Sequence, residues 1–354
     1  MFWVLLVLLV VIAAYLLFWP VSIDPVAWTA PVAPGLKGVY EPNTFLDCVE
    51  RHYSGQLPGP EDITMDAQGR LYTGVVDGRI LRLSAEGDSV ETFAATGGRP
   101  LGMAWDAHGN LIVADALKGL LSVDPQGTVS VLATEAEGLP FGFTDDVDVA
   151  QDGTIYFTDA SWKFHPPNYM ADLMEGRGNG RLLAYDPKTK TARTLVRDLH
   201  FANGVSISPD QSFVLVNETW KYRVLRYWLT GGGQGEWDVF IDNLPGFPDN
   251  IASNGAGMFW LALFTVRNPV ADALAPHPFL RKVAWRSPQF MLPKAKPFSF
   301  VLGLNAAGDV VHNLQGPAGR LSPVTSVNEF GDYLYLGSVE DNAIGRVRVP
   351  AAQR

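Results

Sequence analysis

Cysteine is almost absent from this chain, and its absence excludes two kinds of structure. Cys48 is the single cysteine among 354 residues, so the chain can build neither a disulfide framework nor a thiolate metal site. The six histidines show no HxxxH or HExxH spacing, which argues against a zinc centre as well. A disulfide-stapled fold and a zinc enzyme are therefore not expected.

Basic runs and nucleotide motifs are also missing. The formal net charge is -10 and none of the 27 Lys and Arg residues forms a run, so no nucleic acid partner is expected, because phosphate binding requires a basic face. No GxSxG, P-loop or dinucleotide pattern occurs. The stretch GRGNG at 176–180 lacks the preceding strand and following helix that a phosphate site needs.

Charge is absent altogether from the first 23 residues, MFWVLLVLLVVIAAYLLFWPVSI. About 20 apolar residues suffice to cross the hydrocarbon core as a helix, so residues 1–23 are predicted to be a transmembrane anchor. A cleaved signal peptide is the alternative, but the run is too long, has no basic start and is not followed closely by a small-x-small site. Lys37 and Arg51 are the first basic residues, so the positive-inside rule gives little guidance, and we expect the folded domain outside the cytoplasm.

The rest of the chain consists of repeated units. Residues 60–98 and 99–138 match in turns, apolar positions and length, and further copies begin near positions 143, 201, 247 and 323. Each copy has short alternating or apolar strands separated by Gly, Asp and Asn turns such as DAQGR and DAHGN. Units of about 40 residues with four strands are typical of propeller blades. The sequence therefore predicts an all-β, six-bladed propeller over 46–350, after a proline-rich stalk at 24–45 and before a tail at 351–354.

Two copies are interrupted by insertions, at 161–180 and at about 266–298. Long loops on a rigid scaffold usually cover or shape a site. The segment LDCVERHYSGQL, before the first full copy, resembles the outer strand of a blade. We expect it to close the ring against the last blade.

One repeat position is rich in oxygen-bearing side chains. It lies eleven residues before the apolar centre of the second strand and is occupied, in chain order, by Glu61, Leu101, Asp145, Asn203, Asp249 and Val324. Equivalent positions at the start of the innermost strands surround the channel of a propeller. Hard cations such as Ca²⁺ take six to eight oxygen ligands, and three carboxylates in one channel would repel each other without a cation. The predicted metal ligands are Glu61, Asp145, Asn203 and Asp249.

The alternative is that these residues cap turns, as Asp, Asn and Glu often do in β-loops. Turn caps need not share a register, however, and four of the six copies carry oxygen at the same phase. Asn250 and Asp146, each adjacent to a predicted ligand, are expected to support the metal or to contact substrate.

At these residues the chain resembles the strictosidine-synthase-like branch of the calcium propellers. That superfamily also contains the senescence-marker-protein gluconolactonases and the paraoxonases. The resemblance covers roughly residues 45–350 and rests on GPEDI, GRLYTG, RPLG, FTDDVDVAQDGTIYFTD, FANGVSISPD, RVLRYWL and FIDNLPGFPDNI. It implies one channel ion, usually Ca²⁺, on the four positions above, and it allows a second, structural ion. In the hydrolytic members the aspartate matching Asp249 is a metal ligand also proposed as nucleophile or general base, so Asp249 is the candidate catalytic residue.

Three positions depart from the family pattern. The third-blade ligand is usually Asn, whereas this chain has Asp145, whose extra carboxylate could tighten Ca²⁺ binding or alter reactivity. Paraoxonases place a catalytic His in a Pro-His-Gly turn of the second blade, where this chain has Leu101 in RPLG. Strictosidine synthase uses a glutamate at the start of the sixth blade, where Val324 and Thr325 stand here, which argues against a condensation of that kind.

Several other side chains are candidates for the surroundings of the metal. The aromatic residues that could line an apolar pocket above it are Trp162, Trp220 and Phe264, although core or inter-blade packing would explain them equally well. His165 lies in the first insertion and could act as acid or base, but a position on a surface loop also explains it.

The sequence leaves two main functions open. The first is a membrane-anchored, Ca²⁺-dependent hydrolase of small-molecule esters or lactones, in which the metal polarises the carbonyl while Asp249 activates water or attacks directly. The second is a non-catalytic propeller with a structural Ca²⁺, whose top face binds a partner. The missing histidine and glutamate support the second, because they leave no obvious proton shuttle.

Overall fold

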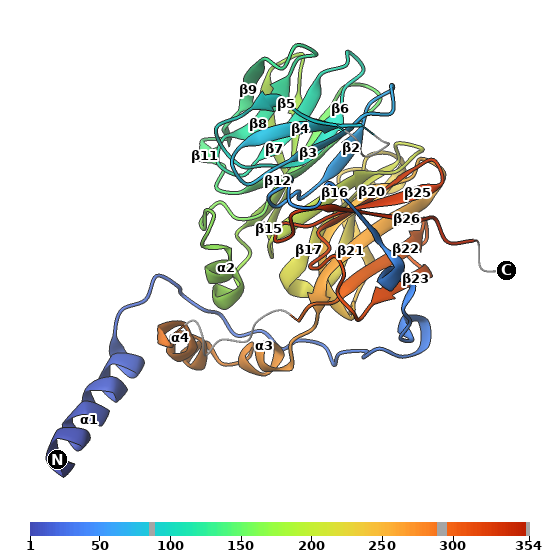
Figure 1. Ribbon diagram of the computed structural model, residues 1–354. Helices are drawn as coiled ribbons and strands as arrows, with labels where there is room; N and C mark the ends of the chain where they lie inside the picture. The colour runs from blue at the N-terminus through green and yellow to red at the C-terminus, as the bar shows by residue number, and fades with distance from the viewer. Residues whose placement is uncertain (85–88, 289–295, 352–354) are drawn as a thin grey trace.

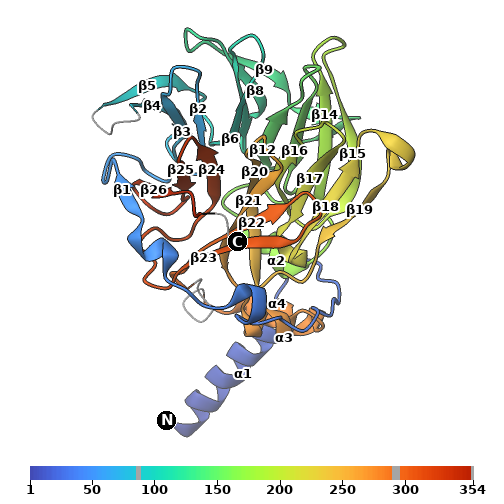
Figure 2. The same cartoon turned by 90° about the vertical axis from the view of Figure 1, so that its right-hand side faces the viewer.

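The computed structural model describes residues 1–84, 89–288 and 296–351, and the repeats in it form a six-bladed propeller (Figures 1 and 2). Each blade is an antiparallel sheet of four strands. The all-β, six-bladed fold predicted from the repeats is confirmed. Of the predicted tail, 351–354, all but Ala351 lies outside the described residues.

The first three blades each use four consecutive strands, the innermost first. The first contains β2 (Ile63–Met65), β3 (Leu71–Gly74), β4 (Arg79–Leu83) and β5 (Val90–Ala95). The second contains β6 (Pro100–Trp105), β7 (Leu111–Asp115), β8 (Gly119–Val123) and β9 (Val129–Ala133). A short ribbon of β10 (Glu135–Ala136) and β11 (Leu139–Pro140) precedes the third, which contains β12 (Thr144–Val149), β13 (Ile155–Asp159), β14 (Gly180–Asp186) and β15 (Thr191–Leu199).

The fourth and fifth blades repeat this order. The fourth contains β16 (Ala202–Ile207), β17 (Phe213–Glu218), β18 (Arg223–Trp228) and β19 (Trp237–Ile241). The fifth contains β20 (Gly246–Ser253), β21 (Met258–Val266), β22 (Ser299–Asn305) and β23 (Val310–Gly316). The sixth combines β24 (Ser326–Phe330), β25 (Tyr333–Gly337) and β26 (Ile344–Arg348) with β1 (Glu50–His52). Single 3-10 turns lie at η1 (Gly38–Tyr40), η2 (Phe45–Cys48), η3 (Thr219–Lys221) and η4 (Gly231–Gly233).

Strand β1 closes the ring by pairing antiparallel with β26, and Figure 2 shows the two side by side. The Arg51 guanidinium also donates two hydrogen bonds to the Asp341 carboxylate, at 2.5 and 2.6 Å. The expectation that the segment before the first full repeat closes the ring is therefore confirmed. Because the two ends of the propeller share one sheet, the ring cannot open without breaking this pairing.

The core lies between adjacent blades. The second strands are buried on both faces, and every residue of β7 and β17 is buried. Outer strands such as β9 contain only exposed and half-buried residues instead. Tyr72 of the first blade and Val113 of the second belong to one such inter-blade cluster. This stacking fixes the innermost strands that line the channel.

The two predicted insertions contain short helices: α2 (Tyr169–Glu175) in the first, and α3 (Pro269–Leu274) and α4 (Pro278–Arg286) in the second. Local signals set their ends. Gly176 stops α2 in the left-handed conformation with φ +64°, which glycine adopts without strain. The Asn268 side chain accepts hydrogen bonds from the first turn of α3, whose first residue is Pro269.

The N-terminal segment runs from α1 (Phe2–Phe18) across both insertions (Figure 1). Helix α1 has 17 residues, and none of the helices among the described residues has both the length and the apolarity of a membrane span. The anchor predicted over 1–23 therefore stays a prediction. In the predicted stalk, 24–45, the Val26 N–H donates to the Glu175 carbonyl and the Trp28 N–H donates to the Ala275 carbonyl, so this part of the chain lies against α2 and α3.

Candidate functional site in the central channel

The four predicted ligands lie at the start of the innermost strands. Glu61 precedes β2, Asp145 is in β12, Asn203 is in β16 and Asp249 is in β20. The innermost strands contact one another in order round the ring. All four side chains are buried, with exposed fractions of 3%, 5%, 5% and 7%. The repeat phase identified from the sequence thus corresponds to buried positions at the starts of four innermost strands.

A repeated irregularity occurs in these strands beside the predicted ligands. The pairing register with the second strand shifts between Thr144 and Val147, between Ala202 and Val205, and between Pro248 and Ile251. Each shift brackets a predicted ligand and the residue after it, and bulges of this kind re-aim side chains beside active sites. Asp146 and Asn250 line the cavity of the channel, whereas Asp145 and Asp249 are not among its lining residues.

Hydrogen bonds connect some of the polar groups, and other groups lack partners. Asn250 Nδ2 donates to Glu61 Oε1, and the Asn203 side chain forms a hydrogen bond with Asp249. Among the described residues, Glu61 Oε2, Asn203 Oδ1 and Asn250 Oδ1 are buried without a hydrogen-bond partner. Because unpaired buried oxygens are costly, these three atoms indicate room for an ion or water between them.

Burial makes the ring carboxylates unfavourable as anions. Burial, followed by the charges of Asp62 and Asp249, raises the pKa of Glu61 well above its usual value. Burial and the charge of Asp249 also raise the pKa of Asp145 well above its usual value. Burial raises the pKa of Asp249 to about 8, against the hydrogen bond from Asn203. A cation among these groups would favour their anionic forms.

The four predicted ligands suit a hard cation in their chemistry, because each offers oxygen. Glu61, Asn203 and the neighbouring Asn250 each have one side-chain oxygen without a hydrogen-bond partner among the described residues. Across the described ranges, however, no three His, Cys, Asp or Glu side chains come close enough together to form a metal-ligand group by themselves. An ion in this channel would therefore depend on the Asn203 amide and on solvent as well as on the carboxylates.

Beside the ring, the channel widens into a cavity of about 230 Å³. Carboxylates in this cavity couple neighbouring blades: Asp146 accepts the backbone N–H of Val205 at 2.8 Å, and Asp148 accepts that of Ile207 at 2.8 Å. Burial raises the pKa of Asp148 to about 6. Asp146, expected near the metal, therefore also holds the third blade against the fourth.

Arg99 is a neighbour of the ring that the sequence analysis missed. Its Nη2 donates to the Gly59 carbonyl at 2.9 Å, and its Nη1 is buried with no partner among the described residues. Burial lowers the pKa of Arg99, while the charges of Glu61, Asp115 and Asp145 act in the opposite direction. The only signal in the sequence is its place in RPLG, two residues before the ring position at Leu101.

Tyr169 is a second residue whose surroundings the sequence did not indicate. It begins α2, and its pKa is raised by burial and then by the charges of Glu340 and Asp249. Its side chain is 37% exposed. Nothing in the pattern of the insertion marked this residue, because its position depends on where α2 packs.

The remaining predicted residues lie either in the interior or on the surface. The Trp220 indole donates to Asp172 of α2, in the first insertion, at 3.1 Å. Phe264 packs against the apolar core between the fourth and fifth blades. Trp162 is 40% exposed, and His165 is also exposed, both on the first insertion.

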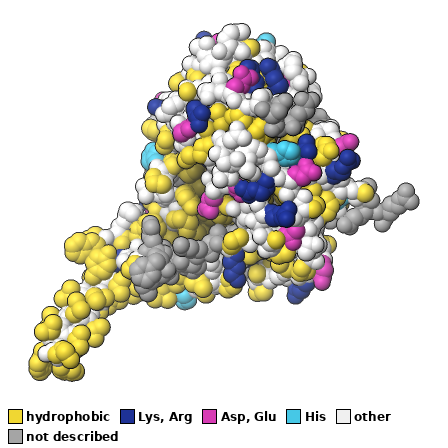
Figure 3. All heavy atoms as spheres, in the orientation of Figure 1, with side chains coloured by type: hydrophobic (Ala, Val, Ile, Leu, Met, Phe, Trp, Pro, Cys, Tyr) yellow, Lys and Arg dark blue, Asp and Glu magenta, His cyan; other side chains and the backbone are white. Residues whose placement is uncertain are grey.

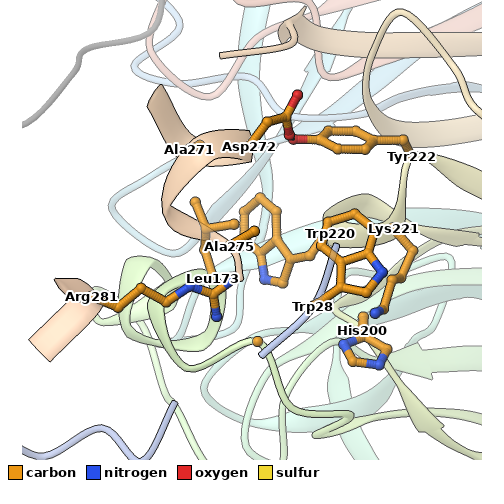
Figure 4. Close-up of a pocket in the computed structure, with 11 residues that line it drawn as sticks. Trp28, Leu173, His200, Trp220, Lys221, Tyr222, Ala271, Asp272, Ala275 and Arg281 are labelled. Atoms are coloured by element: carbon orange, nitrogen blue, oxygen red, sulfur yellow. The ribbon is translucent and has the colours of Figure 1, made fainter. Parts of the chain in front are cut away.

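A second pocket lies between the N-terminal segment and the two insertions (Figure 4). Trp28, Trp220, Lys221 and Arg281 are among the residues that line it. The Lys221 Nζ lies 4.2 Å from the centroid of the Trp28 ring. The volume of about 20 Å³ has room for one water molecule, so this pocket is a packing gap between three segments.

Comparison with known proteins gives related sequences along most of the chain. The model of the strictosidine synthase family matches residues 145–232, and that of the strictosidine synthase-like N-terminal region matches residues 38–83. The adipocyte plasma membrane-associated protein of Bos taurus is 38% identical over 95% of this chain and 87% of its own length. A strictosidine synthase-like protein of Arabidopsis thaliana is 39% identical over 86% of this chain and 82% of its own length.

Solved structures share the fold at low sequence identity. A gluconolactonase from Xanthomonas campestris superposes with a TM-score of 0.63 at 16% identity, covering 93% of this chain and 99% of that protein. Regucalcin from Agrobacterium tumefaciens, a calcium-binding protein, superposes with a TM-score of 0.59 at 15% identity, covering 86% and 95% of the two chains. At these identities the likeness establishes the propeller alone.

Proposed function

The chain belongs to the strictosidine synthase-like family, and on this premise we propose that it is a membrane-attached hydrolase of esters or lactones with Ca²⁺ in its channel. The observation that carries the proposal is the ring of four buried oxygen-bearing side chains at one repeat phase. The unpaired oxygens of Glu61 and Asn203 support the ion. The description of one structural neighbour as a gluconolactonase and of another as calcium-binding supports the reaction class and the metal.

Calcium, when bound, would polarise the substrate carbonyl and favour the negative charge that develops on its oxygen. The carboxylate of Asp249 takes the proton of the attacking water or attacks the carbonyl carbon itself. The hydrogen bond from Asn203 orients that carboxylate.

The test compares Asp249→Asn with Asp148→Asn in the full-length protein. Both changes remove a carboxylate from an innermost strand, but Asp148 is half-buried and lies outside the ring. Hydrolysis of a panel of aryl esters and lactones should be lost with chelator, return with Ca²⁺, and fall at least about a hundredfold in Asp249→Asn. Asp148→Asn should keep most of the activity. Equal activity of the two variants, or activity indifferent to chelator, would refute the catalytic role of the ring.

A non-catalytic propeller with a structural ion is the second candidate, and one observation favours it. Leu101 and Val324 fill the two remaining ring positions and are 4% and 0% exposed, so neither blade offers a proton-transfer group there. Under this function Ca²⁺ raises the melting temperature, no substrate of the panel turns over, and Asp249→Asn loses stability only.

Membrane attachment is part of the first proposal. The side chains of α1 are apolar and largely exposed, as at Phe2 (72%) and Val10 (60%), and α1 projects from the propeller (Figures 1 and 3). The names of the mammalian relatives describe them as plasma membrane-associated. We place the propeller outside the cytoplasm. Extraction of the protein from membranes by alkaline carbonate would contradict insertion of α1.

A further inference from the structure

Helix α4 has two different faces. Arg281 and Trp285, one turn apart, point inward: Arg281 Nη1 donates to the Val26 and Glu175 carbonyls at 3.3 Å, and Trp285 packs on the apolar cluster that contains Ile23. On the outer side, Phe279 is 55% exposed and Leu280 is 44% exposed. Two adjacent large apolar side chains on one short helix differ from the scattered exposure that is normal for a soluble surface.

Helix α4 is basic in its own sequence. That sequence, PFLRKVAWR, contains three cations and no carboxylate, and of the three only Arg281 points inward. The Arg286 guanidinium donates to the carbonyls of Trp19 and Leu16, at 2.6 and 2.9 Å, so α4 holds the C-terminal end of α1. Lys282 is 35% exposed and lies 3.4 Å from the carboxylate of Asp24, which is 67% exposed. A basic amphipathic helix of this kind is suited to the surface of an anionic membrane.

The neighbouring helices extend the same face. Helices α2 and α3 both contact α4, and Figure 1 shows α3 and α4 beside the base of α1. Val270 of α3 is 51% exposed, and Met170 of α2 is 37% exposed. Val270 and Met170 therefore add exposed apolar side chains on the two helices that contact α4.

We propose that the outer face of α4, together with Val270 and Met170, rests on an anionic lipid surface at the base of α1. The observation behind it is the exposed apolar pair on a cationic helix that is bonded to α1. The inference rests on the proposed membrane attachment and adds a second contact with the bilayer to it.

Single labels on the full-length protein test this contact. Cys48 is the sole cysteine and is exposed, so Cys48→Ser gives a background for single cysteines at Leu8, Leu280 and Val131. Val131 is the matched control, because it is an apolar side chain 60% exposed on β9, an outer strand of the second blade. Each variant is labelled with an environment-sensitive fluorophore and reconstituted in phosphatidylcholine vesicles with and without phosphatidylserine. Acrylamide, a neutral quencher, reports exposure to water.

The label at position 280 should be quenched at least about threefold less than the label at 131, and the difference should grow with phosphatidylserine. Adding Phe279→Asp should remove that protection, whereas Val239→Asp on the outer strand β19 should leave it unchanged. Protection at position 8 shows that α1 is inserted.

Three results would overturn the inference. Equal quenching at 280 and 131 with position 8 protected means that α1 inserts but α4 does not touch lipid. Protection at 280 that disappears when the protein is diluted at constant lipid composition means that a second copy covers the face. If acrylamide quenches the label at position 8 as strongly as the label at 131, α1 is not inserted, and the attachment on which the inference rests is lost. None of these measurements uses hydrolysis, so failure of the proposed activity would be recognised separately.

Discussion

The ion pair between Arg181 and Asp159 offers a sharp test of how the loop before Asp145 is held. Arg181 Nη2 lies 2.6 Å from Asp159 Oδ2, and the two side chains are 2% and 0% exposed. Both partners also bond to the backbone of residues 139–143, because Asp159 accepts two N–H groups there and Arg181 donates to two carbonyls. The pair thus fastens the loop that leads directly into Asp145.

We expect Arg181→Met to be strongly destabilising. It preserves much of the side-chain length but leaves the Asp159 carboxylate buried without its counter-charge, and breaking one side of a buried pair costs about 3–5 kcal/mol. A domain of about 300 residues loses roughly 1.5 °C of melting temperature per kcal/mol, so the expected decrease is about 5–8 °C. Thermal unfolding of the full-length protein in matched detergent measures it.

Arg82→Met is the matched control. Arg82 also pairs with a carboxylate at 2.5 Å, that of Glu91, but the side chains are 24% and 59% exposed. Solvent screening limits such pairs to about 0–1 kcal/mol, so the melting temperature should change by less than about 2 °C. The double variant Arg181→Met/Asp159→Asn should recover part of the loss, because it removes both charges. Equal effects of Arg181→Met and Arg82→Met, or strict additivity in the double variant, would refute the reasoning.

Two further predictions concern the packing and the pH dependence. A Cβ at Gly204 would lie 2.6 Å from the Asn250 Cα, so Gly204→Ala should force the fourth and fifth blades apart. We expect this change to lower the free energy of unfolding by about 1–3 kcal/mol and to weaken Ca²⁺ binding. The control is Gly232→Ala, where a Cβ would have no atom within 4 Å, and it should change neither the melting temperature nor the Ca²⁺ titration. Burial raises the pKa of Asp172 from 3.8 to about 6, so the folded state favours its protonated form; this stabilisation is complete below the unfolded value and is lost as the pH rises through about 6. Between pH 4 and 6 the melting temperature of Asp172→Asn should therefore fall less than that of the unmodified protein. Equal falls in the two proteins would contradict the assignment.

The repeat determined how much of the fold could be predicted. Strand order, blade number and ring closure follow from local turn chemistry and from a phase that recurs along the chain, so the ring position at Asp145, Asn203 and Asp249 could be read from spacing alone. The bulges could not, because the eleven-residue spacing marks where a strand begins and carries no record of a local register shift. The place of Asp146 and Asn250 in the lining of the channel cavity appears only when the strands are paired.

The mouth of the channel was beyond sequence reasoning for a different reason. Helix α2 has seven residues, and isolated helices of that length are unstable in water, so contacts from elsewhere fix where it lies. Its buried Glu175 accepts hydrogen bonds from Lys163 Nζ and from the backbone N–H of Asp24 in the N-terminal segment. Asp24 in turn accepts from Arg177, just beyond α2, at 2.6 Å and from Lys282 of α4 at 3.4 Å. The segment that follows α1 therefore holds both insertions together, and the position of α2 depends on residues that no local pattern connects to it.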